Sequence, residues 1–92
     1  MSEAAIERKL VEKIRKIGGI AYKFVSPDNP GVPDRLIILP DGRIVFVELK
    51  SSFGRLAKLQ AWQISRMKEL GCDVRVLHGV DDVDRFISEV SG

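Results

Sequence analysis

The sequence predicts an α/β fold with a mixed sheet, formed by one domain that spans residues 1–92. Apolar residues recur at helical spacing near both ends of the chain, and short runs rich in Ile and Val lie between them. A chain of 92 residues suffices for one small core without disulfides. We therefore expect a helix, three strands, a helix, a strand and a short C-terminal helix.

The first helix is predicted to begin after Ser2, whose side chain can cap it. Gly18-Gly19 should end this helix. Residues 20–25 alternate enough to predict a strand, and the Pro, Gly, Asp and Asn residues of positions 26–31 predict a loop after it. The apolar residues at helical spacing are Ile6, Leu10, Ile14 and Ile17, with Val11 at the edge.

Two short apolar runs, residues 36–39 and 44–47, follow this loop and are joined by Pro40-Asp41-Gly42. A tight connection between two such runs is typical of an antiparallel hairpin. Continuous apolar runs indicate strands that are buried on both faces. We therefore expect this hairpin at the centre of the sheet.

The second half of the chain predicts a helix over residues 56–70, ended by Gly71, and a half-exposed strand over 73–77. The connection between the third and fourth strands is long enough for a parallel crossover. Asp81 or Asp82 can cap a last helix that carries Val83, Phe86, Ile87 and Val90. The expected apolar face of the 56–70 helix consists of Leu56, Leu59, Met67 and Leu70.

The composition excludes several classes of protein. Hydrophobic residues make up 45% and charged residues 30% of the chain, which is typical of a soluble globular domain. No apolar stretch is long enough to cross a bilayer, so we expect no membrane partner. Cys72 and His78 are the single Cys and His, which excludes a disulfide framework and a Cys/His zinc site and favours the reducing cytoplasm. The net charge of +2 is too small to indicate nucleic-acid binding by itself.

Asp34, Glu48 and Lys50 form the pattern that carries chemistry. Because successive strand residues alternate faces, Glu48 and Lys50 should share one face of the hairpin. If the hairpin brings Asp34 beside them, two carboxylates and an ammonium converge. Such a set can hold a divalent cation and position a water molecule beside it. The alternative is a pair of solvated surface charges and a turn aspartate, but charges among apolar neighbours favour the catalytic interpretation.

A longer set of motifs surrounds this trio. In chain order they are Gly18-Gly19, Ser26-Pro27, Gly31-Val32-Pro33-Asp34-Arg35, Phe46-Val47-Glu48-Leu49-Lys50, Gly54-Arg55-Leu56, Gln60 and Gly71. Together they resemble the virus-type replication-repair nuclease (VRR-NUC) domain of the PD-(D/E)XK nuclease superfamily, over nearly the whole chain. The stretch between Arg55 and Gln60 departs from it by lacking the Ser-Pro that often opens the second helix. The resemblance implies a restriction-endonuclease-like core and a stand-alone protein of phage type, which would act in the cytoplasm of the host cell.

The resemblance also implies site residues and a cofactor. Asp34, Glu48 and the backbone carbonyl of Leu49 would bind Mg²⁺ or Mn²⁺. Lys50 would orient the attacking water or stabilise charge on the phosphate. Gln60 would orient the site or contact a phosphate, although it can equally be a core-edge polar group. Glu3 would be the acidic residue that the family places on the first helix, with Glu7 as the alternative, unless Glu3 only favours the helix N-terminus.

DNA and a second copy of the chain are the expected partners. Arg35, Arg55 and Lys58 lie near Lys50 in the predicted fold and can contact phosphates, although scattered surface charge is the plain alternative. Trp62 should project from the side of its helix that faces away from Leu56 and Leu59, which suggests a partner surface. The small size of the chain favours a homodimer.

We therefore expect a Mg²⁺- or Mn²⁺-dependent endodeoxyribonuclease that acts on Holliday junctions or other branched DNA of replication and recombination. A DNA-binding or assembly module that no longer cleaves is the alternative from another class. A flap or restriction-type nuclease would share the site and differ in substrate. Metal-dependent nicking separates the first alternative from the enzyme, and a panel of DNA structures separates the second.

Overall fold

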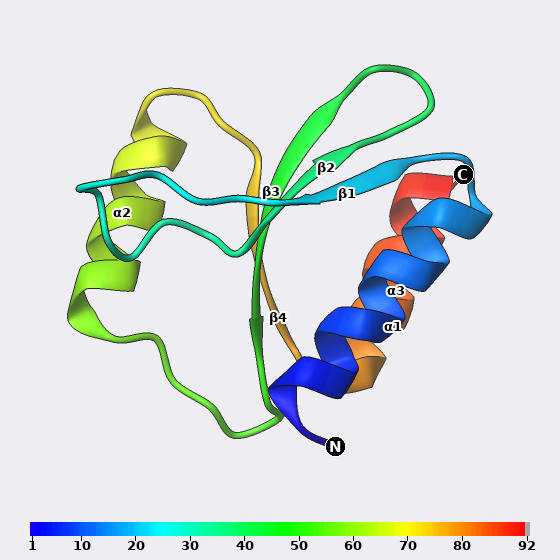
Figure 1. Cartoon of the computed structure of the whole chain (residues 1–92), viewed down its shortest axis with the longest axis horizontal. Coiled ribbons are helices and arrows are strands. Elements are labelled where there is room, and N and C mark those ends of the chain that lie inside the picture. Colours follow the sequence, from blue (N-terminus) through cyan, green and yellow to red (C-terminus); the bar gives the residue numbers. More distant parts are fainter. Residues whose placement is uncertain (92) are drawn as a thin grey trace.

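A four-stranded mixed sheet lies between two helices on one face and one helix on the other (Figure 1). The computed structural model describes residues 1–91. It confirms the predicted α/β class and order, with a C-terminal helix longer than expected. The elements are α1 (Glu3–Lys16), β1 (Ile20–Lys23), β2 (Arg35–Ile38), β3 (Ile44–Lys50), α2 (Lys58–Glu69), β4 (Val74–His78) and α3 (Gly79–Ser91).

Helix α1 begins and ends where the sequence predicts. The Ser2 hydroxyl accepts a hydrogen bond from the Ala5 backbone N–H at 3.2 Å, so the first turn is capped. Gly18, at a φ of +90°, turns the chain out of the helix in a conformation that glycine adopts without strain. The inward stripe of α1 is fully buried and consists of Ile6, Leu10 and Ile14.

The sheet has the order β1-β2-β3-β4, and its strands pair antiparallel, antiparallel and parallel. The predicted central hairpin and parallel crossover are therefore both confirmed. Alternate side chains of β3 divide between the two faces of the sheet. Val45, Val47 and Leu49 join the core beneath α1 and α3, whereas Glu48 and Lys50 point to the face on which α2 lies. This core consists of Ile6, Leu10, Ile14, Ile37, Leu39, Val45, Val47, Leu49, Leu77, Val83, Phe86 and Val90.

The prediction that both hairpin strands are buried on both faces is wrong at one end of the sheet. Ile44 of β3 is 50% exposed. Tyr22 of β1, outside the hairpin, is 55% exposed. Helix α2 is short and lies at one side of its face, toward β4, while α1 and α3 together cover the opposite face (Figure 1). The α2 face of the sheet is therefore only partly covered.

The expected apolar face of α2 is wrong in part. The helix begins at Lys58, two residues later than predicted, and Leu59 is 45% and Leu70 77% exposed. Leu56 and Met67 are partly buried, and Ile64 is the buried residue of the helix. Gln60 and Gln63 are partly buried as well and donate hydrogen bonds to Glu48 and to the Pro30 carbonyl. Because two glutamines occupy the inward side, apolar periodicity alone does not identify it.

Helix α3 follows β4 without a loop and starts at Gly79, two residues before the first predicted cap. The Asp82 carboxylate accepts a hydrogen bond from the His78 backbone N–H at 2.8 Å, so the aspartate stabilises the helix start from within the first turn. No helix among residues 1–91 is long and apolar enough to cross a membrane.

Candidate functional site

The pairing of β2 with β3 brings Asp34 beside Glu48. Arg35 is registered opposite Val47, so the preceding residue of one strand lies beside the following residue of the other. The Asp34 carbonyl accepts a hydrogen bond from the Phe24 backbone N–H at 2.8 Å, which ties this point of the loop to the end of β1. The structure therefore brings together the two carboxylates that the sequence predicts.

Glu48 is a buried carboxylate, with 1% of the residue exposed. Its Oε2 accepts a hydrogen bond from Gln60 Nε2 at 3.2 Å and lies 3.7 Å from Lys50 Nζ. Its Oε1 is buried and has no hydrogen-bond partner in the described part of the chain, residues 1–91. Burial, followed by repulsion from Asp34, raises the pKa of Glu48 to about 7 although Lys50 opposes the shift. A carboxylate in this state gains much from a cation at its free oxygen.

The pKa of Asp34 is raised as well, and burial is the largest cause. Lys23 and Lys50 lower it, while Glu7 and Glu3 raise it further. Lys23, at the end of β1, is a nearby charge that sequence reasoning missed. The sequence gives little indication that Lys23 lies near Asp34, because only the pairing of β1 with β2 brings this exposed lysine there.

Lys50 and Gln60 approach Glu48 from two elements. Lys50 shares the Glu48 face of β3, and only 13% of its side chain is exposed. Gln60 Oε1 accepts a hydrogen bond from the Ala57 backbone N–H at 2.9 Å, while its Nε2 donates to Glu48. One amide therefore closes the first turn of α2 and holds the carboxylate, which fixes the helix relative to the site.

The Leu49 backbone faces the side of Asp34. The Phe46 N–H donates to the Asp73 carbonyl, on the β4 side of β3. Backbone directions alternate along a strand, so Glu48 also turns its N–H and C=O toward β4 and Leu49 turns them toward β2. The registered pairing with β2 ends at Val47. The Leu49 carbonyl is therefore directed past the end of that ladder, where Asp34 lies.

A hard divalent cation fits this set of oxygens. No cluster of three or more His, Cys, Asp or Glu side chains able to hold a metal occurs within residues 1–91. Mg²⁺, however, commonly binds to one or two protein carboxylates and takes its other ligands from water and phosphate. The buried Oε1 of Glu48, which has no hydrogen-bond partner among residues 1–91, is the observation that fits a cation at this site.

The two candidate acids of α1 differ in their surroundings. Glu7 accepts hydrogen bonds from Arg35 Nε at 2.7 Å and from Lys23 Nζ at 3.1 Å. Burial raises the pKa of Glu7, but these two cations lower it more. Glu3 is exposed, and its charge raises the pKa of both Asp34 and Glu48. The catalytic role of Glu3 stays a prediction.

The three predicted DNA-binding cations are not equivalent. Arg35 lies on the α1 face of the sheet, where Glu7 and the Ala21 carbonyl accept its hydrogen bonds. Arg55 and Lys58 are exposed, in the segment between Lys50 and α2 and at the start of that helix. Only the latter two are placed to reach a phosphate without breaking an existing ion pair.

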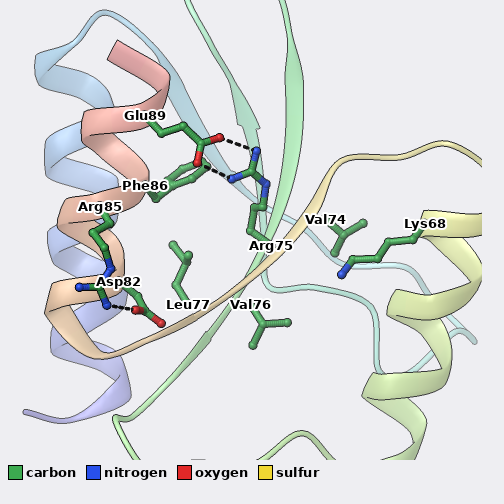
Figure 2. Close-up of a pocket in the computed structure, with 9 residues that line it drawn as sticks. All are labelled: Lys68, Val74, Arg75, Val76, Leu77, Asp82, Arg85, Phe86 and Glu89. Carbon is green, nitrogen blue, oxygen red and sulfur yellow. Dashed lines mark hydrogen bonds and ion pairs between the residues drawn. The ribbon is translucent and has the colours of Figure 1, made fainter. Parts of the chain in front are cut away.

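A hollow away from this site lies along β4, between α2 and α3 (Figure 2). Arg75 donates to both Glu89 oxygens, at 3.1 and 2.8 Å, and to Asp73 at 2.7 Å. Arg85 donates to Asp82 in the same hollow. The Arg75–Glu89 pair joins α3 to the edge strand, whereas the Arg85–Asp82 pair lies within α3. These four charges are matched within the protein, so we assign them to structure rather than to chemistry.

Comparison with known proteins shows which family the chain resembles. The chain is 51% identical over 79 residues to "Putative nuclease p44" of Acyrthosiphon pisum secondary endosymbiont phage 1, covering 86% of this chain and 85% of that protein. A solved structure named "VRR_NUC domain" superposes with a TM-score of 0.88 at 30% identity, over 94% of both chains. A second, named "VRR_NUC domain protein", shares the fold at 18% identity, with a TM-score of 0.73 over 98% of this chain and 88% of that one. No family model matches the sequence.

Proposed function

The chain belongs to the VRR-NUC family of nucleases, and from this premise we propose that it is a divalent-metal-dependent endodeoxyribonuclease acting at Asp34, Glu48 and Lys50. The observation that carries the proposal is the buried Glu48 carboxylate, which has one oxygen without a partner beside a second carboxylate. A buried polar atom without a partner is uncommon in a folded protein and calls for an explanation, which a bound cation supplies.

Asp34, Glu48 and the Leu49 carbonyl would hold Mg²⁺ or Mn²⁺, which supplies a bound water of lowered pKa and neutralises charge on the phosphate. Lys50 lies on the same face as Glu48 and would orient the attacking water or stabilise the phosphate oxygens. Gln60 keeps Glu48 in place through a hydrogen bond made from the first turn of α2. Glu3 would contribute a further acidic charge from α1.

Branched DNA, with Holliday junctions first, is the proposed substrate, and the host-cell cytoplasm the proposed location. Arg55 and Lys58 would contact phosphates beside the site. Two copies related by a two-fold axis would present two sites to symmetric strands of a junction. Linear, flap and four-way junction DNAs, each tested with Mg²⁺, Mn²⁺ and Ca²⁺, distinguish a junction nuclease from a flap or restriction-type enzyme.

Substitution of the carboxylates tests the site. Asp34→Ala and Glu48→Ala should each reduce cleavage by more than about 100-fold, because each removes one of few ligands. Lys50→Ala should lose most activity and keep metal affinity, as measured by calorimetry. Asp41→Ala is the matched control, because this exposed aspartate of the hairpin pairs with Arg43 and should leave cleavage unchanged.

Two results would contradict the assignment. Turnover retained in folded Asp34→Ala or Glu48→Ala protein would remove these residues from the site. DNA binding without metal-dependent nicking of any structure in the panel would favour the alternative function, a DNA-binding module on the same fold. Circular dichroism of each variant establishes that a loss of activity is not a loss of folding.

A further inference from the structure

Phe53 is the most exposed large hydrophobic side chain that the structure describes, at 97%. The other three phenylalanines, Phe24, Phe46 and Phe86, are partly or fully buried. A large apolar side chain stabilises a fold by being removed from water, so Phe53 in this position contributes little to stability. Its position calls for another reason, and it lies three residues after Lys50.

The turn that carries Phe53 is held in place on both sides. The Gly54 N–H donates to the Ser51 carbonyl at 3.0 Å, which closes a four-residue turn. A Cβ at Gly54 would lie 3.3 Å from Lys50 Cβ and 3.0 Å from Ser51 Oγ, so the turn packs against the strand that bears the site. On its other side, Ser52 Oγ would be 2.6 Å from a Cβ at Gly79, at the start of α3. Phe53 is therefore presented from a packed turn.

The surroundings of Phe53 favour a nucleic acid over a protein as its ligand. Its neighbours in the turn are two serines and a glycine, and the next apolar residue along the segment, Leu56, is partly buried. Arg55 and Lys58, both exposed, follow within five residues. An aromatic ring with cations close by is how proteins bind single-stranded DNA, because bases stack on the ring while phosphates meet the cations.

We propose that Phe53 is a binding site for an unpaired nucleobase, on which a base stacks next to the Asp34, Glu48 and Lys50 site while Arg55 and Lys58 hold the flanking phosphates. This inference rests on the proposed function in one respect, that the ligand is DNA. A base within a duplex is already stacked on both sides, so the site selects DNA with unpaired nucleotides at a branch, flap or junction. Selectivity for branched DNA would then reside in one residue.

The test uses fluorescent DNA and needs no cleavage. A flap and a duplex, each with 2-aminopurine at one position, are titrated with the full chain in EDTA, so that binding is measured without turnover. The wild-type protein should quench the fluorescence of the unpaired base in the flap. Phe53→Ala should abolish the quenching and weaken flap binding by about tenfold, with duplex binding unchanged within about twofold.

Conservative variants separate stacking from apolar contact. Phe53→Tyr should keep the quenching, whereas Phe53→Leu, which is apolar but has no ring, should lose it. Retained quenching in Phe53→Ala, or equal weakening for flap and duplex, would overturn the proposal. A molar mass of Phe53→Ala that differs from that of wild type on light scattering would also overturn it, because Phe53 would then belong to a protein interface. Quenching by a wild-type protein that cuts no DNA would remove the nuclease function and leave the base site standing.

Discussion

Glu48 places a carboxylate inside the sheet, on the same strand as Lys50. A glutamate between Val47 and Leu49 must enter a buried strand, where a charge needs a partner. The sequence therefore predicted that Glu48 and Lys50 share a face, and the structure places them 3.7 Å apart. It could not predict which Glu48 oxygen would be left free, because that depends on the hydrogen bond from Gln60 on a distant helix.

The raised pKa of Glu48 makes stability depend on pH. The folded protein, with a Glu48 pKa of about 7 against an ordinary 4.5, binds the proton more tightly than the unfolded chain does. The free energy of unfolding in metal-free buffer should therefore fall as the pH rises from about 4.5 to about 7. Glu48→Gln removes the ionisable group, so its free energy of unfolding should not fall over this range. It should exceed that of wild type by roughly 1 to 3 kcal/mol at about pH 8 and equal it at about pH 4.5.

Urea unfolding of both proteins in EDTA measures this difference. Mg²⁺ added at the higher pH should stabilise wild type more than Glu48→Gln, because a ligand that binds only the folded state raises its stability. An identical pH dependence of the two proteins would show that Glu48 is not held in the buried state described here.

Local sequence patterns predicted which helices and strands form and where they end. Tertiary contacts determined which side of each helix faces the sheet. The Ser2 cap, the glycine pair after α1 and the Pro40-Asp41-Gly42 turn are local signals, and all mark element ends in the structure. Helix α2 is different, because its inward side carries Gln60 and the loop 26–34 packs on it. The inward side of α2 is therefore set by these polar contacts, and the periodicity of its apolar residues predicted a different side.

Gly31 sets the approach of that loop to α2. Its φ is +92°, and a Cβ would lie 3.0 Å from backbone atoms of Leu59. Gly31→Ala should therefore destabilise the protein by roughly 1 to 3 kcal/mol and reduce cleavage, because it separates the Asp34 loop from the helix that holds Gln60. Thermal unfolding and the junction assay measure the two effects.

Gly42→Ala is the matched control for this change. Gly42 has a similar φ of +88°, but a Cβ there has nothing within 4 Å. Gly42→Ala should lower the free energy of unfolding by about 1 kcal/mol through backbone strain alone, and its cleavage should be normal. If Gly31→Ala lost no more activity than Gly42→Ala, the loop contact with α2 would not position the site.

The two faces of the sheet differ across the whole molecule. Under α1 and α3 the sheet carries the continuous core, whereas the α2 face carries the proposed site together with apolar side chains that remain exposed. The sequence predicted the strands but not this division, since helix placement on a face is set by the crossover and the loop lengths. Two exposed apolar surfaces result, one on α2 with Leu59 and Trp62, the other on the sheet with Ile20, Tyr22 and Ile44.

We expect the protein to form a homodimer through the α2 surface, with Trp62 as its anchor. Trp62 is 55% exposed, which agrees with its predicted outward position. The prediction that it faces away from Leu59 is wrong, because Leu59 lies one turn away on the same side of the helix and is itself 45% exposed. A tryptophan at a two-fold contact removes much apolar area from water in both copies at once. Light scattering at micromolar concentration should give twice 10.3 kDa for wild type and 10.3 kDa for Trp62→Ala.

Ile44→Ser makes a comparable change on the sheet surface and should leave the dimer intact, because Ile44 lies on β3 rather than on the proposed interface. Dissociation by Ile44→Ser but not by Trp62→Ala would place the two-fold contact on the sheet. A wild-type monomer that cuts four-way junctions symmetrically would refute the dimer, since one active site cannot meet two symmetric strands at once. A monomer active only on flaps would leave the site chemistry intact and remove junction resolution, because only the second copy supplies the second cut.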